Sequence, residues 1–501
     1  MKILNVQQIR EADQYTIKNE PITSIDLMER ASLKVVDWLV NKFSNKYEIL
    51  VLAGSGNNGG DGLAIARMLS ERDYTVTVFL VLGESGSNDF EENLSRLQSI
   101  KKVNISKDFD FNKSSDKTIF LDAIFGSGLS RPIEGDIANH IRKVNNSQGI
   151  KIAIDIPSGV FADKPSLGDA IYKADYTLSF QVPKLAFMMA ENQPFIGHFE
   201  ILDIGLSKEF IKNCVSDYSI FSLSNEIVSP LKVDSIAHKG IRGRATVIAG
   251  GYAKMGAAII AAKGALHSGI GLLSVQVCQK CIDIIQNQIP EALILQDENE
   301  YVLGTYLEYQ NQDVLVIGPA IGFAQKTSKL LEKILKTYKS QLILDADAIT
   351  ILAENRELLE LLPEGTILTP HHGEFRRLVG NYSNNFEALM QLKSFCKHHK
   401  VVVVLKGKFS AVCDERGYIS FNKTGNQGMA KGGSGDLLCG IIAGIAPRIK
   451  TPYETAKLAV YLHGLSGDIS WKEYGDNFMT PSLMISNLKE TFKLIEKETE
   501  Y

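Results

Sequence analysis

Short apolar runs alternate with segments of helical spacing over most of the chain. In the first half these runs predict strands at residues 49–53, 75–82, 119–122 and 150–156, and a helical pattern follows the first of them at 63–71. Strands that alternate with helices predict a parallel sheet covered by helices. In such sheets, ligands bind at the carboxyl ends of the strands.

A second series of the same kind follows a less regular stretch. Residues 206–232 are rich in Ser, Asn and Asp, so we predict a domain boundary there, with domains at 1–217 and 222–500. The segment 437–445 is apolar and rich in small residues, which predicts a buried helix. Later strands are predicted at 244–250, 314–317, 341–345, 366–369 and 401–405. The predicted fold class is α/β, in two domains.

Composition and charge limit the classes of binding partner and the cellular compartment that we expect. The 501 residues carry a formal net charge of −4, so no basic excess indicates a nucleic-acid or anionic-membrane partner. Six scattered cysteines are too few for a disulfide scaffold and fit a reducing compartment. The N-terminal segment has no secretory pattern, and the apolar runs are far below the roughly 18 residues of a membrane span. We therefore expect a cytoplasmic protein.

Three glycine-containing segments of the first half each follow a predicted strand: 53–62 (AGSGNNGGDG), 122–132 (DAIFGSGLSRP) and 155–159 (DIPSG). Glycine lets backbone N–H groups approach a phosphate, and a helix N-terminus favours anions. The first segment fits the G-x-G-x-x-G dinucleotide fingerprint, but no acid ends the next strand, which disfavours an ordinary NAD dehydrogenase.

Oxygen-bearing side chains in these segments suggest chemistry. A carboxylate at a strand end can serve as a general base, and Asn58, Asp122 and Ser158 have the oxygen atoms that a hard cation binds. The alternative for each residue alone is a helix cap or a turn former.

In this order and spacing, the three segments resemble the NAD(P)HX epimerase domain, the YjeF N-terminal family, over about residues 1–215. That family interconverts the two epimers of hydrated NADH and NADPH and binds potassium. The resemblance implies a Rossmann-like domain in which Asp155 is the acid–base residue and Asn58, Asp122 and Ser158 hold potassium. It implies substrate contacts from Asn57, Asn58, Gly59, Gly60, Asp61, Gly126, Ser127, Gly128, Leu129, Ser130, Arg131, Pro132 and Asp155.

The segment 432–436 (GGSGD) opens the predicted buried helix of the second half. Its glycines free successive N–H groups to stabilise charge on a transferred phosphoryl group, and Asp436 can take a proton from a substrate hydroxyl. The alternative is a glycine turn with a capping Asp. The G-x-G-D pattern before a small-residue helix resembles the ribokinase-like superfamily.

Further motifs narrow that resemblance to the NAD(P)HX dehydratase domain over about residues 225–500. They are HKG at 238–240, GGYAKMGA at 250–257, GPAIG at 318–322, DADA at 345–348, TPHHGE at 369–374 and KGKFS at 406–410, which could form a hairpin around a nucleotide. The resemblance implies that Asp436 activates the substrate hydroxyl and that magnesium accompanies the nucleotide. It implies substrate contacts from Ala257, Gly322, His372 and Asp436, and nucleotide contacts from Lys406, Gly407, Lys408, Phe409, Ser410 and Gly435. Lys431 departs from the family pattern and is expected to add a charge near the phosphates.

Two groups of potential metal ligands have a simpler interpretation. The His371–His372 pair could bind metal, but a substrate hydrogen bond is favoured. Cys278-x-x-Cys281 could form a zinc site with Cys396, His398 and His399, but a position in or beside the predicted strand 272–277, without a redox role, is favoured.

The two resemblances together imply a bifunctional repair enzyme. The first domain would epimerise R- and S-NAD(P)HX, and the second would dehydrate the S form to NAD(P)H while ADP is converted to AMP and phosphate. Fusions in this order resemble prokaryotic members that use ADP, whereas separately encoded relatives use ATP; relatives of both domains form homo-oligomers. The alternative is a ribokinase-like small-molecule kinase with an N-terminal ligand-binding or scaffold domain.

Overall fold

The computed structural model describes residues 1–100, 102–106, 111, 114–233, 235–309 and 311–498. The chain divides into two compact units, Met1–Tyr218 and Ser219–Tyr501. Both are α/β units, so the predicted fold class is confirmed. None of the described helices is long and apolar enough to cross a membrane.

The first unit contains eight named strands and a set of helices around them. The strands are β1 (Lys2–Ile3), β2 (Glu48–Ala53), β3 (Thr75–Leu80), β4 (Asn104–Ser106), β5 (Thr118–Ala123), β6 (Ile150–Ile154), β7 (Tyr176–Phe180) and β8 (His198–Leu202). The helices are α1 (Val6–Asn19), α2 (Ser24–Lys42), α3 (Asn57–Ser70), α4 (Asn88–Gln98), α5 (Gly135–Asn146), α6 (Gln193–Ile196) and α7 (Lys208–Asn213), with 3₁₀ turns η2 (Leu185–Met188) and η3 (Ala190–Asn192).

The sheet of this unit is parallel, with seven strands in the order β4-β3-β2-β5-β6-β7-β8. The chain winds outward from β2 in one direction through β3 and β4, then returns to β5 and winds in the other. The strand order therefore reverses between β2 and β5, which is where open parallel sheets form their ligand crevice. The segments after these two strands carry the first two predicted glycine motifs.

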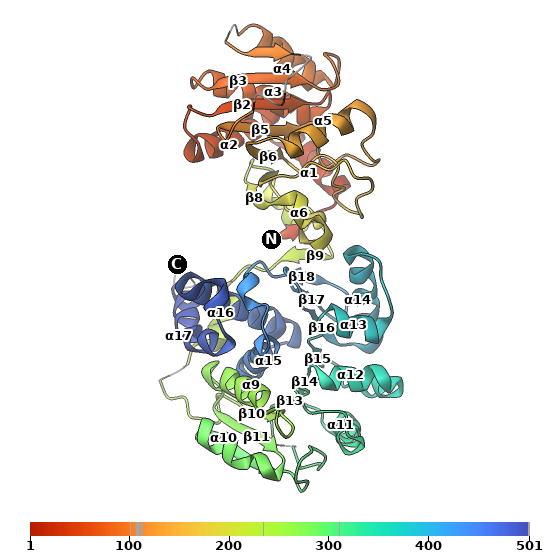
Figure 1. Ribbon diagram of the computed structural model, residues 1–501, viewed down its shortest axis with the longest axis vertical. Helices are drawn as coiled ribbons and strands as arrows, with labels where there is room; N and C mark the ends of the chain where they lie inside the picture. Colours follow the sequence, from red (N-terminus) through yellow and green to blue (C-terminus); the bar gives the residue numbers. More distant parts are fainter. Residues whose placement is uncertain (101, 107–110, 112–113, 234, 310, 499–501) are drawn as a thin grey trace. The chain divides into compact units, whose positions relative to one another are not determined.

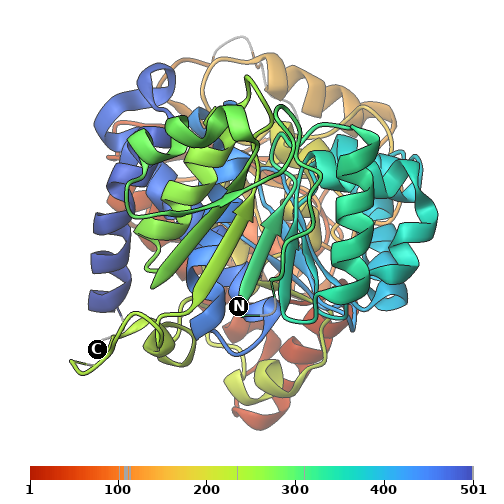
Figure 2. The ribbon, with the colours of Figure 1, turned by 90° about the horizontal axis from the view of Figure 1, so that it is seen from below.

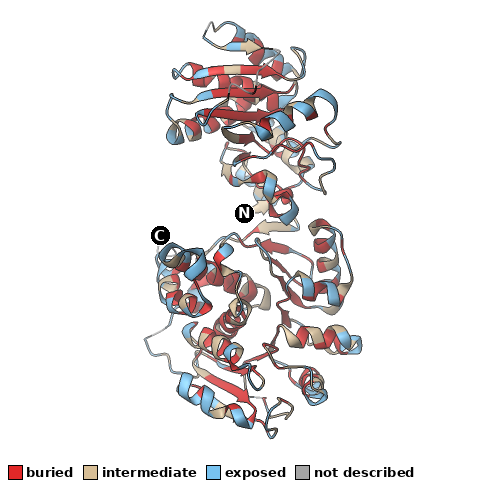
Figure 3. Cartoon of the chain, viewed as in Figure 1, coloured by how far each residue is buried: buried red, intermediate tan, exposed pale blue. Residues whose placement is uncertain are grey.

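Apolar side chains cover both faces of this sheet. Helices α2, α3 and α4 pack on one face through Val35, Leu69 and Phe90, and α5 packs on the other through Ile141 and neighbours. The central strands are consequently buried, as Figure 3 shows. Strand β2, with the sequence EILVLA, is buried at every position after its first residue, which is typical of a parallel strand covered on both faces.

The second unit follows β9 (Tyr218–Ile220), which lies at the boundary. Its strands are β10 (Arg244–Ile248), β11 (Leu272–Val277), β12 (Leu293–Gln296), β13 (Val314–Ile317), β14 (Gln341–Leu344), β15 (Ile367–Leu368), β16 (Val402–Leu405), β17 (Ala411–Cys413) and β18 (Ile419–Phe421). Its helices are α8 (Asn225–Val228), α9 (Met255–His267), α10 (Ile282–Gln288), α11 (Gln325–Thr337), α12 (Asp347–Glu354), α13 (His372–Val379), α14 (Asn385–His399), α15 (Ser434–Ile445), α16 (Pro452–Phe478) and α17 (Pro481–Glu498). Short 3₁₀ turns are η4 (Ser229–Leu231), η5 (Gln279–Cys281), η6 (Arg356–Leu361), η7 (Gln427–Met429) and η8 (Ala446–Arg448).

The sheet of this unit runs in the order β18-β17-β16-β15-β14-β13-β10-β11-β12. It is parallel from β12 to β16, continues in the antiparallel strands β17 and β18, and has β9 hydrogen-bonded next to β18. Helices α9, α10, α15, α16 and α17 share one buried core, and α11 to α14 lie on the other face (Figure 1, Figure 2). The strand order reverses between β10 and β13, so a second crevice is expected there.

Helices α9 and α15 run parallel and in close contact. A Cβ added to Gly440 on α15 would lie 2.1 Å from the carbonyl oxygen of Ala261 on α9, and one added to Gly444 would lie 2.6 Å from that of Ala265. The contacting residues are four positions apart on both helices, so the register between the two backbones is constant. One turn earlier, Ala257 on α9 and Asp436 on α15 occupy matching positions.

Observed and predicted elements differ most at α3. The helical pattern predicts a start at residue 63, but α3 begins at Asn57, with Gly56 as its N-cap. The low helix propensity of glycine hides this first turn in the sequence, and packing of Gly60 against Met28 and of Gly62 against Ala123 stabilises it. The motif NNGGDG is thus the start of a helix.

We expect Gly440→Ala to destabilise the protein, because the added methyl group cannot fit against the Ala261 carbonyl; overpacking of this kind costs about 1–3 kcal/mol. The matched control is Gly256→Ala in α9, where an added Cβ meets nothing within 4 Å. That change should stabilise by up to about 1 kcal/mol through helix propensity. Urea unfolding of the full chain measures both, and equal effects of the two substitutions would contradict the proposed packing.

Candidate functional site

A cavity of about 920 Å³ opens in the first unit where the segments after β2, β5 and β6 meet. Helices α1 and α2 form its opposite wall. Many of the predicted substrate contacts line it: Asn57, Asn58, Asp61, Gly126, Ser127, Gly128, Leu129, Ser130, Arg131 and Asp155. The structure therefore brings all three motifs of the first half to one site.

Three residues of the predicted set are not part of this lining: Gly59, Gly60 and Pro132. A Cβ on Gly59 would lie 1.9 Å from the Gly54 carbonyl oxygen, and one on Gly60 would lie 2.8 Å from the sulfur of Met28. These two glycines allow close packing behind the cavity, while their neighbours Asn58 and Asp61 face it.

Asp155 is held by a buried cation. Lys184, whose side chain is 1 % exposed, donates from Nζ to Asp155 Oδ1 and to Ser179 Oγ at 2.7 Å, and the Ser127 N–H donates to Asp155 Oδ2 at 3.2 Å. Burial alone would raise the pKa of Asp155, but Lys184 and these hydrogen bonds lower it below its ordinary value. Asp155 therefore faces the cavity as a carboxylate. Its φ of +66° is left-handed, a conformation that Asp tolerates better than most residues.

Two further carboxyl groups line the cavity, and their pKa values are shifted upward, opposite to that of Asp155. Burial, followed by the charge of Asp155, raises the pKa of Asp13 to about 6. Burial, then Asp155 and Asp13, raises the pKa of Asp61 well above its ordinary range, although Ser32 partly offsets this. One cavity thus contains a carboxyl group with a lowered pKa beside two carboxyl groups with raised pKa values, which is the pattern of an acid–base pair.

Asp122 and Ser158 form a buried group behind Asp155. Ser158 donates to Asp122 from its backbone N–H at 2.7 Å and from Oγ at 2.6 Å, and the Ile124 N–H donates at 3.2 Å. Burial raises the pKa of Asp122 to about 6, and no ion pair reaches it from any described residue. Asn58, the third predicted cation ligand, lies where a Cβ on Gly126 would meet its amide at 3.4–3.5 Å.

In the second unit, a buried ion pair lies at the carboxyl edge of the sheet. Asp345, after β14, accepts from Lys406 Nζ at 3.0 Å and from Thr369 Oγ1 at 2.8 Å. Burial opposes ionisation of both partners, but their mutual attraction lowers the pKa of Asp345 and raises that of Lys406. The pair lies beneath α15, because a Cβ on Gly435 would be 3.2 Å from Lys406 Nζ.

Asp436 is in the first turn of α15, next to this pair. Burial, followed by the charge of Asp345, raises its pKa to about 6, although Lys406 acts in the opposite sense. The preceding Gly433 is the N-cap, with φ +91°, and Ser434 Oγ lies 3.3 Å from Nε2 of the buried His463. Burial lowers the pKa of His463 to about 4, so it is neutral near pH 7.

The structure separates the roles of the two adjacent histidines. His371 caps α13: its Nδ1 accepts from the N–H groups of Gly373 and Glu374 at 3.0 and 3.1 Å. His372 Nδ1 is 2.7 Å from the Tyr382 hydroxyl, and its Nε2 faces the Gly407 position at 3.6 Å from an added Cβ. His372 therefore lies beside the predicted nucleotide segment.

The segment Lys406–Ser410 forms the predicted hairpin turn between β16 and the antiparallel β17. Ser410 Oγ accepts from the Gly407 N–H at 3.4 Å and lies 3.2 Å from the Gly407 carbonyl oxygen, which closes the turn. Lys408 and Phe409 lie at its tip, with the Lys408 ammonium 5.4 Å from the Phe409 ring centre.

The remaining predicted substrate contacts lie at the reversal between β10 and β13. Gly322 has φ +80° and donates its N–H to Asp347 Oδ2 at 2.8 Å. Ala257 is in the first turn of α9. Three alanines in the loops after β10, β13 and β14 also have positive φ values: Ala253 (65°), Ala320 (55°) and Ala346 (47°). Left-handed alanine is costly, and such strain tends to cluster at functional sites.

Lys431 does not point to the predicted phosphate site, contrary to the expectation from the sequence. Its Nζ donates to the carbonyl oxygens of Asn477 at 2.7 Å and Met479 at 2.5 Å. These carbonyls belong to the end of α16, so Lys431 ties the glycine segment to the C-terminal helices.

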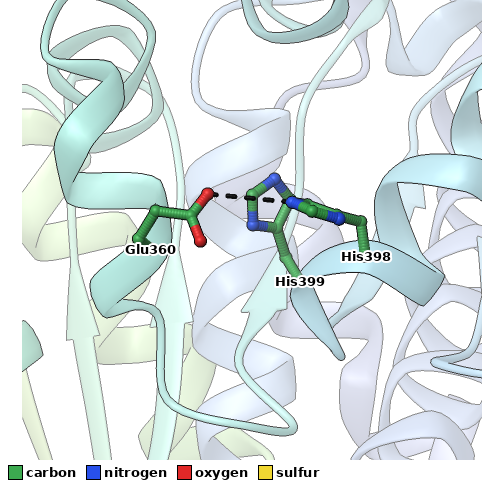
Figure 4. Close-up of side chains that lie close together, drawn as sticks. All are labelled: Glu360, His398 and His399. Carbon is green, nitrogen blue, oxygen red and sulfur yellow. Dashed lines mark ion pairs between the residues drawn. The ribbon is translucent and has the colours of Figure 1, made fainter.

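The described residues do not bring together the zinc site that was considered for Cys278, Cys281, Cys396, His398 and His399. The buried Cys278 and Cys281 sulfurs are 3.3 Å apart, and Cys396 contacts the Cys413 carbonyl. Among described side chains, Glu360, His398 and His399 do place donor atoms within 4.8 Å of one another (Figure 4). Glu360 and His398 are largely exposed and 3.8 Å apart, which an ordinary surface ion pair explains.

Several residues of these sites were not identified from the sequence. Lys184 had a visible signal, because it is a single cation in the apolar run 180–189, just after β7. Asp13 and His463 had none, since only the packing of α1 and α16 brings them to the sites. Asp345 lay in a recognised motif, but its pairing with Lys406 required the order of strands β14 to β16.

Comparison with known proteins agrees with this division. The family described as YjeF-related protein N-terminus matches residues 24–186, and the family described as NAD(P)H-hydrate dehydratase matches residues 245–490. The bifunctional NAD(P)H-hydrate repair enzyme of Coxiella burnetii is 30% identical over 492 residues, which cover 96% of this chain and 98% of that protein. Its counterpart in Thermofilum pendens is 29% identical and covers 100% of this chain and 98% of its own. The ADP/ATP-dependent NAD(P)H-hydrate dehydratase structure from Bacillus subtilis, co-crystallised with ATP/Mg2+, covers 55% of this chain and 99% of its own, at 27% identity and a TM-score of 0.48.

The fold and the family matches define a two-domain α/β enzyme in which a YjeF-related N-terminal domain precedes an NAD(P)H-hydrate dehydratase domain. The match over nearly the whole of both chains makes the assignment specific. The chain belongs to the family of bifunctional NAD(P)H-hydrate repair enzymes, with one domain for each activity.

We expect Lys184→Met to destabilise the first unit by about 3 kcal/mol, because it leaves the Asp155 carboxylate buried without its cation. The double variant Asp155→Asn/Lys184→Met should recover much of this loss, because it removes both charges. Urea unfolding of the four members of the cycle measures the coupling. Strictly additive effects, within about 0.5 kcal/mol, would show that the pair does not act as a unit.

Proposed function

We propose that the first unit interconverts R- and S-NAD(P)HX, and that the second dehydrates the S epimer to NAD(P)H while ADP is converted to AMP and phosphate. The observation that carries the proposal is the placement of a carboxyl group with a shifted pKa at the carboxyl edge of each sheet, Asp155 in one and Asp436 in the other. Each lies beside backbone N–H groups and polar segments that fit a nucleotide.

In the first unit, inversion at C6 requires a bond to that carbon to break and re-form on the opposite face. Asp155, kept ionised by Lys184, accepts the proton of the C6 hydroxyl. The C6–N1 bond then opens, with its electron pair on N1, as C6 becomes a carbonyl carbon. N1 adds back to the opposite face of C6, and the proton returns from Asp155 to the oxygen. Asp61, with its raised pKa, keeps its proton and donates a hydrogen bond to the substrate. The Asn58 amide nitrogen is buried without a hydrogen-bond partner among the described residues, so it is available to the ligand.

A potassium ion fits the group formed by Asn58, Asp122 and Ser158. The donor set is entirely oxygen, as a hard cation prefers. Asp122 is fully buried and accepts three hydrogen bonds, yet no cationic side chain in the described ranges pairs with it. A bound monovalent cation would supply the missing positive charge and hold the segments after β5 and β6 together.

In the second unit, the chemical obstacle is that hydroxide is a poor leaving group. Asp436 takes the proton of the C6 hydroxyl, whose oxygen then receives the β-phosphoryl group of ADP, and AMP is released. Phosphate then leaves C6, pushed by the ring nitrogen lone pair, and loss of a proton from C5 restores the double bond. N–H groups at the start of α15 stabilise the transferred phosphoryl group, and magnesium would neutralise the nucleotide phosphates.

The nucleotide is proposed to lie over the hairpin turn of β16 and β17 and the first turn of α15, in contact with Lys406–Ser410 and Gly435. His372 Nε2 lies near Gly407 and Lys406 Nζ lies near Gly435, and this nearness supports a position for both side chains between nucleotide and substrate. All six cysteines are free thiols, five of them buried, which is compatible with the reducing cytosol that we propose as the setting.

The central test measures phosphate release from hydrated NADH with ADP and ATP in parallel. We expect NADH and orthophosphate in equal amounts, with faster turnover on ADP. Asp436→Asn should lower dehydration at least about 100-fold by removing the base, and leave epimerisation intact. Asp155→Asn should have the reverse effect. A stable phosphorylated product would instead indicate a small-molecule kinase, and loss of both activities in either folded variant would contradict two independent sites.

Dehydration should depend on the ionisation of Asp436. A general base acts only when deprotonated, so kcat/KM should fall about tenfold per pH unit below the pKa of about 6 and level off above it. Measurements of kcat/KM from pH 5 to 8 test this acid-side decrease, and the residual activity of Asp436→Asn should not show the decrease. An unchanged decrease in that variant would assign the titration to another group.

A further inference from the structure

The substrate is a dinucleotide, and the residues proposed above contact only its reacting half. This inference rests on the proposed function of the second unit, in which C6 of the hydrated ring lies at Asp436. The nucleotide occupies the side of β16 and β17. Gly322 follows β13, and helix α9, which carries Ala257 in its first turn, follows β10; both strands lie on the side of β14 away from β16. The adenosine half of the substrate must therefore extend along the sheet edge away from β16.

That end of the edge carries three exposed aromatic side chains: Tyr252 is 55% exposed, Tyr301 48% and Phe323 55%. They come from the loops after β10, β12 and β13, and Phe323 directly follows Gly322. Large aromatic surface left open to solvent by several separate loops indicates a contact surface more than chance exposure does. Neighbouring strands are about 4.8 Å apart, so β14 to β10 spans about 10 Å, which the pyrophosphate linker of a dinucleotide can bridge.

The three loops are joined by backbone hydrogen bonds. The Gly251 N–H donates to the Ala320 carbonyl at 2.8 Å, and the Tyr252 N–H to the Tyr301 carbonyl at 3.5 Å. The rings of Tyr252 and Tyr301 meet edge to face, with centres 5.0 Å apart and an angle of 88°. Each ring therefore fixes the orientation of the other and still leaves a face open.

The loop that carries Tyr301 is shaped by a fully buried carboxylate. Asp297 accepts hydrogen bonds from the N–H groups of Gly304 and Thr305 at 2.8 and 2.9 Å, and from Gln276 Nε2 at 3.0 Å. These bonds hold both ends of the loop 297–305 against β11. The aromatic surface is thus formed before a ligand arrives, which lowers the entropy cost of binding.

We propose that Tyr252 and Tyr301, with Phe323 beside them, form a stacking platform for the adenine base of the hydrated dinucleotide. A purine lies on an aromatic face without needing a specific hydrogen-bond pattern, and such stacking contributes substantially to binding. The adenine base keeps the same position while C6 reacts, so stacking on the platform stabilises the bound substrate and the transition state equally and acts on KM and not on kcat.

The test compares two substrates in the full chain: hydrated NADH and hydrated reduced nicotinamide mononucleotide, which lacks the adenosine half. Tyr252→Ala and Tyr301→Ala should each raise the KM for hydrated NADH about tenfold. The kcat and the KM for ADP should stay within about twofold, and the mononucleotide should react equally well with wild type and variants. Tyr252→Phe should retain the wild-type KM, because it keeps the ring.

The matched control is Tyr418→Ala, which removes a comparably exposed tyrosine from the turn between β17 and β18. It should leave every constant unchanged. An unchanged KM for hydrated NADH in Tyr252→Ala/Tyr301→Ala, in an active enzyme, would overturn the platform alone. If the same double variant raised the KM for ADP and left that for hydrated NADH unchanged, the platform would bind ADP and not the substrate. A wild-type chain that does not convert hydrated NADH would overturn the proposed function, and the platform with it.

Discussion

The close parallel packing of α9 and α15 determines the geometry of the second site. Gly440 and Gly444 bring the α15 backbone against the carbonyl groups of α9, at a separation that admits no side chain. The two helices run in the same direction with a constant register. Their first turns therefore lie at matching positions along the two helices. Extended to these first turns, the register pairs Asp436 of α15 with Ala257 of α9. In the proposed phosphoryl transfer both partners must lie within contact distance, and the glycines that fix this register lie at least one turn away from Asp436.

Both units place a lysine against a strand-end aspartate, with different consequences. In the first unit, Lys184 is fully buried behind Asp155 and keeps the carboxylate itself ionised in the cavity. In the second, Lys406 pairs with Asp345 and remains partly open, while the neighbouring Asp436 keeps a raised pKa. A buried ion pair contributes little net stability, because desolvation offsets the attraction. We infer that the main effect of each ion pair is to determine which carboxyl group of its site is charged.

Much of this architecture was predictable from the sequence, because the strands of parallel sheets are continuous apolar runs. Strands 272–277 and 314–317 were predicted to the residue, and the turn after β16 was predicted as a hairpin. The start of α3 was misplaced, because glycine-rich first turns have little helical signal. Motif residues such as Asp155 and Asp436 stand out locally, and their roles stay predictions. Asp13, His463 and the aromatic loop of Tyr301 could not be found this way, since their positions depend on how distant elements pack. The direction of the Lys431 side chain was wrong for the same reason.

The residues assigned to each site come from one unit of the chain. Every residue that lines the first cavity lies between Ile9 and Leu206, and every residue assigned to the second site lies after Ser219. Because both sites occupy one polypeptide, each molecule synthesised carries one of each, whatever the level of expression. The ratio of the two active sites is thus fixed at translation, and no cell that makes this chain can accumulate dehydration capacity without the epimerisation capacity that supplies it.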